Sequence, residues 1–83
     1  MNIVLKHEEY QVKNGFASSI PELKLAGHGR SPELAEQNLK RIVLCFLKPF
    51  EREGTLENEI HILETRGIKV EKNGSGLNII MAN

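Results

Sequence analysis

Apolar and polar residues over the first twenty positions follow the pattern of a β-hairpin. Residues 3–12 are enriched in isoleucine, valine and tyrosine, with imperfect alternation, and predict a strand. Asn14-Gly15 is a strong signal for a two-residue hairpin turn, because both central residues of such a turn adopt positive φ. Residues 16–20 then form the returning strand, in a register that places Val12 opposite Ala17.

Two polar features limit this hairpin. His7-Glu8-Glu9 is polar on both faces of the predicted strand, so we expect a bulge or a solvent-exposed edge there. Pro21 ends the returning strand because it has no N–H to donate. Residues 23–28 are a candidate third strand.

A long helix is predicted from Ser31 to about Lys48. Ser31 can cap its N-terminus, Pro32 suits the first helical position, and Glu33 favours the positive end of the helix dipole. Pro49 disfavours helical geometry at the residue before it, so we expect the helix to end there.

The apolar residues of this helix divide into two groups. Four recur at helical spacing and form the expected core stripe, flanked by Val43: Ala35, Leu39, Ile42 and Phe46. Leu44 and Leu47 project among charged residues, on the face expected to meet solvent. Either these two leucines mark a contact surface, or the second helix folds back and covers them.

A second helix and a closing hairpin complete the expected elements. Thr55 is the expected cap, and Leu56, Ile60 and Leu63 form the apolar stripe. Gly67 ends this helix, with Ile68 placed to contact Leu63 as in a glycine C-cap motif. Residues 68–72 and 77–81 then alternate as two strands around a turn at residues 73–76. Leu77, Ile79 and Met81 share one face, and register favours an even loop.

This order predicts an α+β fold, β-β-β-α-(α)-β-β, in which helices cover one face of an antiparallel or mixed sheet. The 83 residues show no repeat and no linker, so we expect a single domain over residues 1–83. A chain this short buries only about 60% of its unfolded surface. Dimerisation is a common way for a short chain to bury more apolar surface, and we expect a homodimer or a higher homo-oligomer.

Charge and composition argue against nucleic acid and the membrane as partners. Lys and Arg number 11 and Asp and Glu also number 11, so the formal net charge is zero, which argues against non-specific nucleic-acid binding. The longest apolar run, residues 42–47, is far shorter than the roughly 20 residues of a spanning helix. With one cysteine and no signal-peptide pattern, we expect a cytoplasmic protein away from the membrane.

Residues that could carry chemistry are scattered along the chain. His7, His28 and His61 are not paired at metal-ligand spacing, and the sequence contains no Asp at all. Cys45 is expected to be a buried, inert thiol. His28 lies between Gly27 and Gly29, and we interpret it as an exposed loop histidine that a partner could contact. We therefore expect no catalytic residue, no metal site and no cofactor.

The segments GFASSIPEL (residues 15–23) and GRSPELAEQNL (residues 29–39) resemble the HicB-like antitoxin domain. The resemblance extends over roughly residues 3–48, and its motifs are structural, so they indicate fold better than activity. It implies a β-β-β-α-β arrangement, a partial ribonuclease-H-like fold without the catalytic carboxylates. It also implies oligomers, and a function in covering the active surface of a small HicA-like ribonuclease toxin.

The chain departs from the family pattern in three ways. Residues 24–28 replace a frequent Pro-Gly-Cys, and residues 55–82 stand where the family has a simpler closing strand. We therefore expect no separate DNA-binding domain. The leading hypothesis is a non-catalytic protein-binding module of the antitoxin type, or an orphan member, with Leu44, Leu47 and His28 as the candidate partner or self-association surface. The alternative is a small nucleic-acid-binding accessory domain.

Overall fold

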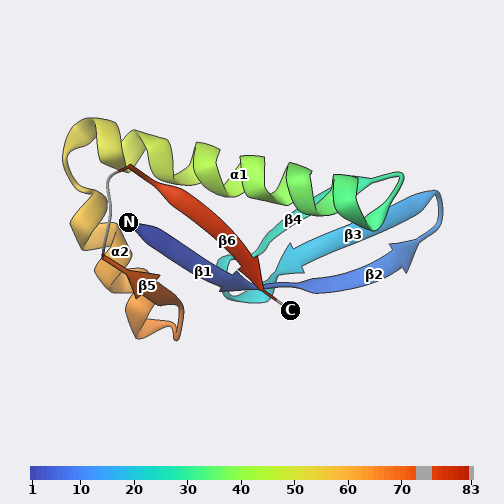
Figure 1. Ribbon diagram of the computed structural model, residues 1–83, viewed down its shortest axis with the longest axis horizontal. Coiled ribbons are helices and arrows are strands. Elements are labelled where there is room, and N and C mark those ends of the chain that lie inside the picture. Colours follow the sequence, from blue (N-terminus) through green and yellow to red (C-terminus); the bar gives the residue numbers. More distant parts are fainter. Residues whose placement is uncertain (73–75, 83) are drawn as a thin grey trace.

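The computed structural model describes residues 1–72 and 76–82, which form two three-stranded sheets and two helices (Figure 1). The elements in chain order are β1 (Asn2–Lys6), β2 (Glu8–Val12), β3 (Gly15–Ile20), the short 3₁₀ helix η1 (Pro21–Leu23), β4 (Leu25–Gly29), α1 (Pro32–Glu53), α2 (Leu56–Thr65), β5 (Lys69–Glu71) and β6 (Asn78–Ala82). The α+β class is confirmed, whereas the expected single sheet is two sheets, ordered β5-β1-β6 and β2-β3-β4.

The predicted first strand is divided at His7. β1 pairs with β5 and β6, and β2 pairs with β3, so the two halves belong to different sheets. The backbone N–H of His7 donates to the carbonyl of Ala82 at 3.2 Å, and its side chain turns into the interior. Of the two alternatives expected at residues 7–9, the solvent-exposed edge holds for Glu8 and Glu9 on the edge strand β2, whereas His7 is buried.

The hairpin between β2 and β3 turns one residue earlier than predicted. Val12 pairs with Gly15, and Tyr10 pairs with Ala17, so Lys13 and Asn14 form the turn. Gly15 is a strand residue, and a Cβ atom built there would lie 2.5 Å from the carbonyl oxygen of Gly29. The glycine is thus required for close approach of the backbones and not for the turn itself.

The two closing strands do not form a hairpin. β1 lies between them, antiparallel to β5 and parallel to β6. Ile3 and Leu5 of β1 are fully buried in the core cluster that they share with Leu39 of α1 and Ile60 of α2. Leu77, Ile79 and Met81 still contact the core, as their alternation predicts. The expected turn residues Asn73, Gly74 and Ser75 lie outside the described part of the chain, and the inference of an even loop no longer applies.

α1 begins as predicted and ends later. The Ser31 hydroxyl accepts from the N–H of Leu34 at 3.2 Å, which confirms the cap. The helix continues through Pro49 to Glu53, where Gly54 adopts a left-handed conformation at φ 77° and ends it. A proline inside a helix removes one backbone hydrogen bond. Leu47, two residues before Pro49, is fully buried, and its burial favours a helix that continues past Pro49 over one that ends there.

The buried stripe of α1 differs from the predicted one. It steps by four residues through Ala35, Leu39, Val43 and Leu47, each fully buried. Ile42 and Phe46, which were expected in the core, are exposed. Each step of four residues rotates about 40° around the helix axis. The N-terminal half lies over β3 and β4, whereas the C-terminal half faces β6 and α2 (Figure 1). The buried face therefore rotates along the helix.

Two glycines allow α1 to lie directly on β4. A Cβ atom at Gly27 would be 2.4 Å from the backbone nitrogen of Leu39 and 2.7 Å from the carbonyl oxygen of Ala35. A Cβ atom at Gly29 would be 2.6 Å from the backbone nitrogen of Ala35. The candidate third strand is confirmed as β4, and its glycines make room for a helix backbone.

α2 ends in the predicted glycine motif. The N–H of Ile68 donates to the carbonyl of Leu63 at 3.1 Å, and that of Gly67 donates to Glu64 at 3.0 Å. Thr55 precedes the helix, but its hydroxyl donates to the Phe50 carbonyl at 3.4 Å and does not cap. α2 contributes Ile60 and Leu63 to the core, with Leu56 packed against it.

Candidate functional site

The outer face of the β2-β3-β4 sheet has no described element over it, whereas α1 covers the inner face (Figure 1). Strand pairing places Tyr10, Ala17 and His28 directly opposite one another on this outer face. Tyr10 is 47% exposed and His28 is also exposed, while Ala17 between them is fully buried. The two rings therefore flank one small, apolar position.

His28 is a strand residue and not the loop histidine that its glycine neighbours suggested. Its backbone carbonyl accepts a hydrogen bond from Asn38 Nδ2 at 2.5 Å, which ties the end of β4 to α1. The side chain points away from α1, because the neighbouring Gly27 faces it. Of the three residues expected on a contact surface, only His28 is exposed.

The two leucines of the predicted contact surface are placed differently. Leu47 is fully buried in the same core cluster as Ile60 and Leu63 of α2, so it offers no surface in the folded chain. Leu44 is half-buried and packs against that cluster. Leu47 is buried because the buried face rotates along α1. Of the two alternatives, cover by the second helix therefore holds for Leu47.

α1 instead exposes a different apolar patch. Ile42 and Phe46 are 36% and 38% exposed, and Cys45 and Pro49 beside them are also exposed. The ring of Phe46 packs edge-to-face on Phe50, with centroids 5.7 Å apart. Cys45 is thus not the buried thiol expected from its place near the predicted stripe. We refer to Ile42, Cys45, Phe46 and Pro49 as the α1 outer patch.

The structure brings together three residues that sequence spacing leaves apart. Single ligand atoms of His7, Glu9 and Glu36 lie within 4.8 Å of one another, and His7 Nε2 is 2.9 Å from Glu9 Oε1. The side chain of His7 is only 2% exposed. Glu36 comes from α1, far along the chain from the break between β1 and β2, so no spacing motif could indicate this group. The expectation that the chain has no metal site is not tested by this grouping and stays a prediction.

Two polar atoms near this group have no hydrogen-bond partner among the described residues: His7 Nδ1 and Ser18 Oγ. Ser18 is fully buried and pairs with Glu9 on one side and with Gly27 on the other. Paired residues of adjacent strands share a face, and Gly27 faces α1, so Ser18 and Glu9 face α1 too. An unpaired buried polar group costs about 1–3 kcal/mol.

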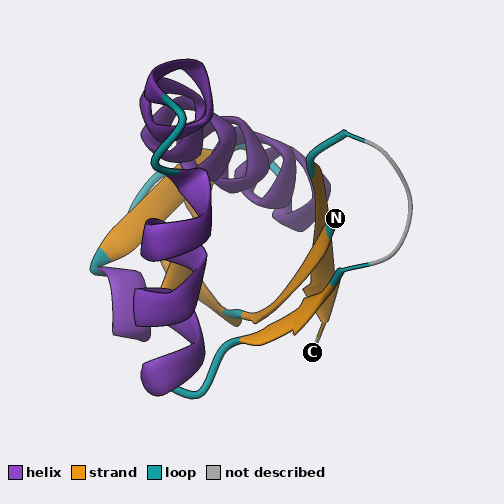
Figure 2. Cartoon of the chain, turned by 90° about the vertical axis from the view of Figure 1, so that its left-hand side faces the viewer, coloured by secondary structure: helices purple, strands orange, loops and turns teal. Residues whose placement is uncertain are grey.

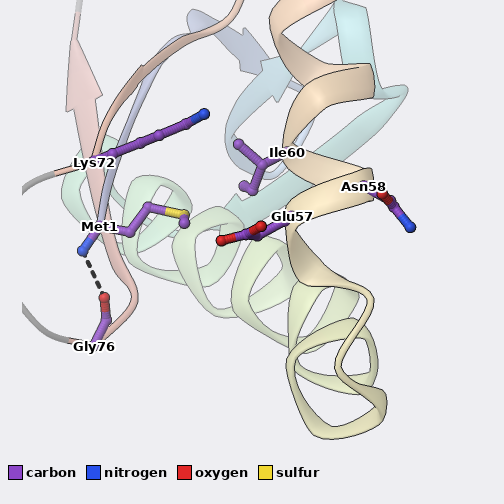
Figure 3. A pocket seen from close by; sticks show the side chains of 6 residues that line it. All are labelled: Met1, Glu57, Asn58, Ile60, Lys72 and Gly76. Carbon is purple, nitrogen blue, oxygen red and sulfur yellow. Dashed lines mark hydrogen bonds between the residues drawn. The ribbon is translucent and has the colours of Figure 1, made fainter.

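An open hollow of about 510 Å³ lies between α2 and the β1 end of the other sheet (Figure 3). The Glu57 carboxylate and the Lys72 ammonium extend into it from opposite sides, while Asn58 points away. The N-terminal amine of Met1 donates to the Gly76 carbonyl at 2.8 Å at its rim. The polar groups do not converge on one point, so the hollow does not have the form of a specific ligand site.

Comparisons with protein-family models, with curated proteins and with solved structures found no match to the chain. Function is therefore inferred from the fold and the side-chain geometry. Within the described residues, neither helix combines the length and the apolar character that crossing a membrane requires.

Proposed function

We propose that this chain is a non-catalytic protein-binding module of the HicB-like antitoxin type, which masks a small HicA-like ribonuclease on the outer face of its β2-β3-β4 sheet. The observation that carries the proposal is the pair Tyr10 and His28, which stands exposed around Ala17 on a sheet face without cover. Tyrosine is enriched among the residues that dominate binding energy at protein interfaces. The flanking strands β2 and β4 are both edges of the sheet.

The order of elements also supports the proposal. The resemblance implies three strands, a helix and a closing strand, and the chain has β2-β3-β4, then α1, then β6 beside β1. The family-like segments fall on β3, η1 and the start of α1, where they form structure and leave the outer face of the sheet free. Masking a ribonuclease requires only a complementary surface, which agrees with the scattered carboxylates of the sequence.

Growth rescue tests this function. Expression of the small open reading frame beside the gene should arrest growth, and co-expression of this chain should restore it. Tyr10→Ala combined with His28→Ala should weaken the complex at least tenfold, or about 1.4 kcal/mol, because both rings leave the contact. His61→Ala, which removes an exposed histidine from α2, is the matched control and should rescue fully. A neighbour that arrests nothing, or equal rescue by all variants, contradicts the proposal.

The α1 outer patch provides a route to self-association within the same proposal. Ile42 and Phe46 are large apolar residues exposed side by side at helical spacing, and contiguous patches of this kind mark protein contacts. Two copies joined through α1 leave the sheet face on each copy free for a ribonuclease. The partner proposed for the patch is therefore a second copy of the chain.

Light scattering on the purified chain tests this route. At about 100 μM the wild type should be a dimer, and Ile42→Lys with Phe46→Lys should make it a monomer, since two charges would enter an apolar contact. Ile62→Lys is the control, because Ile62 is 43% exposed on α2, away from the patch. A monomeric wild type, or loss of the dimer with Ile62→Lys alone, would exclude this surface.

A further inference from the structure

We infer that His7, Glu9 and Glu36 form a binding site for one divalent transition-metal ion such as Zn²⁺, at the junction of the two sheets and α1. The site goes beyond the proposed partner binding and does not depend on it. One imidazole and two carboxylates are ligands of the classes found in zinc sites, and three protein ligands leave a position for water. Imidazole favours transition metals over Mg²⁺ and Ca²⁺, which prefer oxygen ligands.

The distances are within reach of coordination. Tetrahedral zinc with bonds of 2.0–2.2 Å places its ligand atoms about 3.4 Å apart. The three candidate atoms already lie within 4.8 Å of one another, with His7 Nε2 and Glu9 Oε1 at 2.9 Å. His7 is held by burial, whereas Glu9 is exposed and Glu36 is half-buried. Small rotations of the two carboxylates are therefore enough to close the group around an ion.

The unpaired polar atoms are a second, independent observation at the same place. His7 Nδ1 and Ser18 Oγ are buried without a partner, and Ser18 faces α1 beside Glu9. Buried polar groups are nearly always paired with protein, water or an ion. A hydrated ion held by the three side chains brings water molecules whose hydrogens can be donated to Ser18 Oγ. A simple core histidine with one carboxylate partner leaves Ser18 Oγ without a partner.

The location gives the ion a physical role. His7 is the residue at which the chain leaves one sheet and enters the other, and Glu36 lies on the helix that packs against both. An ion bound by these residues links β2 to α1 across the junction. It binds the folded chain and not the unfolded one, and so should raise the unfolding temperature in proportion to the logarithm of its concentration.

Zinc titration of the full, untagged chain, followed through the imidazole nitrogens in long-range ¹H–¹⁵N spectra, tests the inference. We expect saturation at one ion per chain, with shifts at His7 and none at His28 or His61. The unfolding temperature should rise in parallel. Glu36→Gln should weaken zinc binding at least tenfold, whereas Glu33→Gln, an exposed carboxylate on the same helix, should leave it unchanged.

Three results would overturn the site: no saturable binding, shifts at His28 or His61 instead of His7, or equal effects of the Glu36 and Glu33 variants. Glu9→Gln is a second variant on an exposed side chain, and it keeps the test decisive if Glu36→Gln lowers the stability of the fold. The growth-rescue assay is a separate readout, so failure of zinc binding and failure of ribonuclease masking are distinguishable.

Discussion

Replacing Gly27 with alanine should destabilise the chain by about 3 kcal/mol, the upper part of the usual range for overpacking. The added Cβ atom would lie 2.4 Å from the backbone nitrogen of Leu39 and 2.8 Å from its Cα. These are backbone atoms of α1, so relief requires the whole helix to move off β4. A chain of 83 residues has roughly 4–12 kcal/mol of stability in total, and the loss is a large part of it.

Urea denaturation followed by circular dichroism measures this loss, and Ala26→Val is the matched control. Ala26 is the preceding residue of β4, and it is exposed on the outer face. Valine adds more volume there than alanine adds at Gly27, yet the change should stay within about 0.5 kcal/mol, as for most surface substitutions. Equal midpoints for wild type and Gly27→Ala would show that α1 does not lie against β4 as described.

Leu47→Ala should cost about 3 kcal/mol, because the substitution removes a fully buried side chain and leaves a cavity. Leu47 joins the C-terminal half of α1 to Ile60 and Leu63 of α2, which lie in the same cluster. The cavity would open where the two helices meet, beside the internal Pro49. The same denaturation experiment measures the effect.

Leu34→Ala is the control for Leu47→Ala, because it makes the same substitution on the same helix at an exposed position. Leu34 lies on the same helix and is 45% exposed, so its truncation should cost about 0.5 kcal/mol or less. The reverse order, with Leu34→Ala the more harmful change, would mean that the exposed and buried faces of α1 are exchanged relative to the structure.

Local signals in the sequence predicted some element ends and missed others, because α1 continues past the expected stop at Pro49 and the Thr55 side chain does not cap α2. The Ser31 cap, the stop at Pro21 and the glycine motif at Gly67 are all present, because each depends on backbone groups within a few residues. The alternation of Leu77, Ile79 and Met81 also identified the buried face of the last strand. Capping and alternation depend on residues that are close in the sequence, so the sequence alone could indicate these three ends and this face.

Non-local pairing could not be predicted in the same way. The insertion of β1 between β5 and β6 joins the two ends of the chain, and no turn signal indicates such a partner. The buried stripe of α1 follows two different surfaces in succession, so the simplest helical stripe through Ile42 and Phe46 was wrong. The exposure of Cys45 and the burial of Leu47 are both consequences of that one rotation.

The candidate sites also combine features that are local in the sequence with features that depend on distant residues. His28 could be singled out from its glycine neighbours, but Tyr10 could not be placed beside it until the register was known. The register predicted from a turn at Asn14-Gly15 puts Val12 opposite Ala17, where the structure has Tyr10. The grouping of His7 with Glu36 depends on the packing of α1 over the sheet junction, which follows from the tertiary structure alone.

Figure 2 shows the helices and the strands surrounding the interior, with the termini at one side. The outer face of the β2-β3-β4 sheet lies outside this enclosed core, and we propose that the ribonuclease binds there. Titration of ¹⁵N- and ¹³C-labelled chain with the purified product of the neighbouring reading frame, the proposed ribonuclease, tests this binding. Signals of Tyr10, Ala17 and His28 should shift and saturate together, while those of His61 and Ile62 on α2 stay in place. Saturable shifts confined to α2, or none on the outer face of the sheet, would contradict the account.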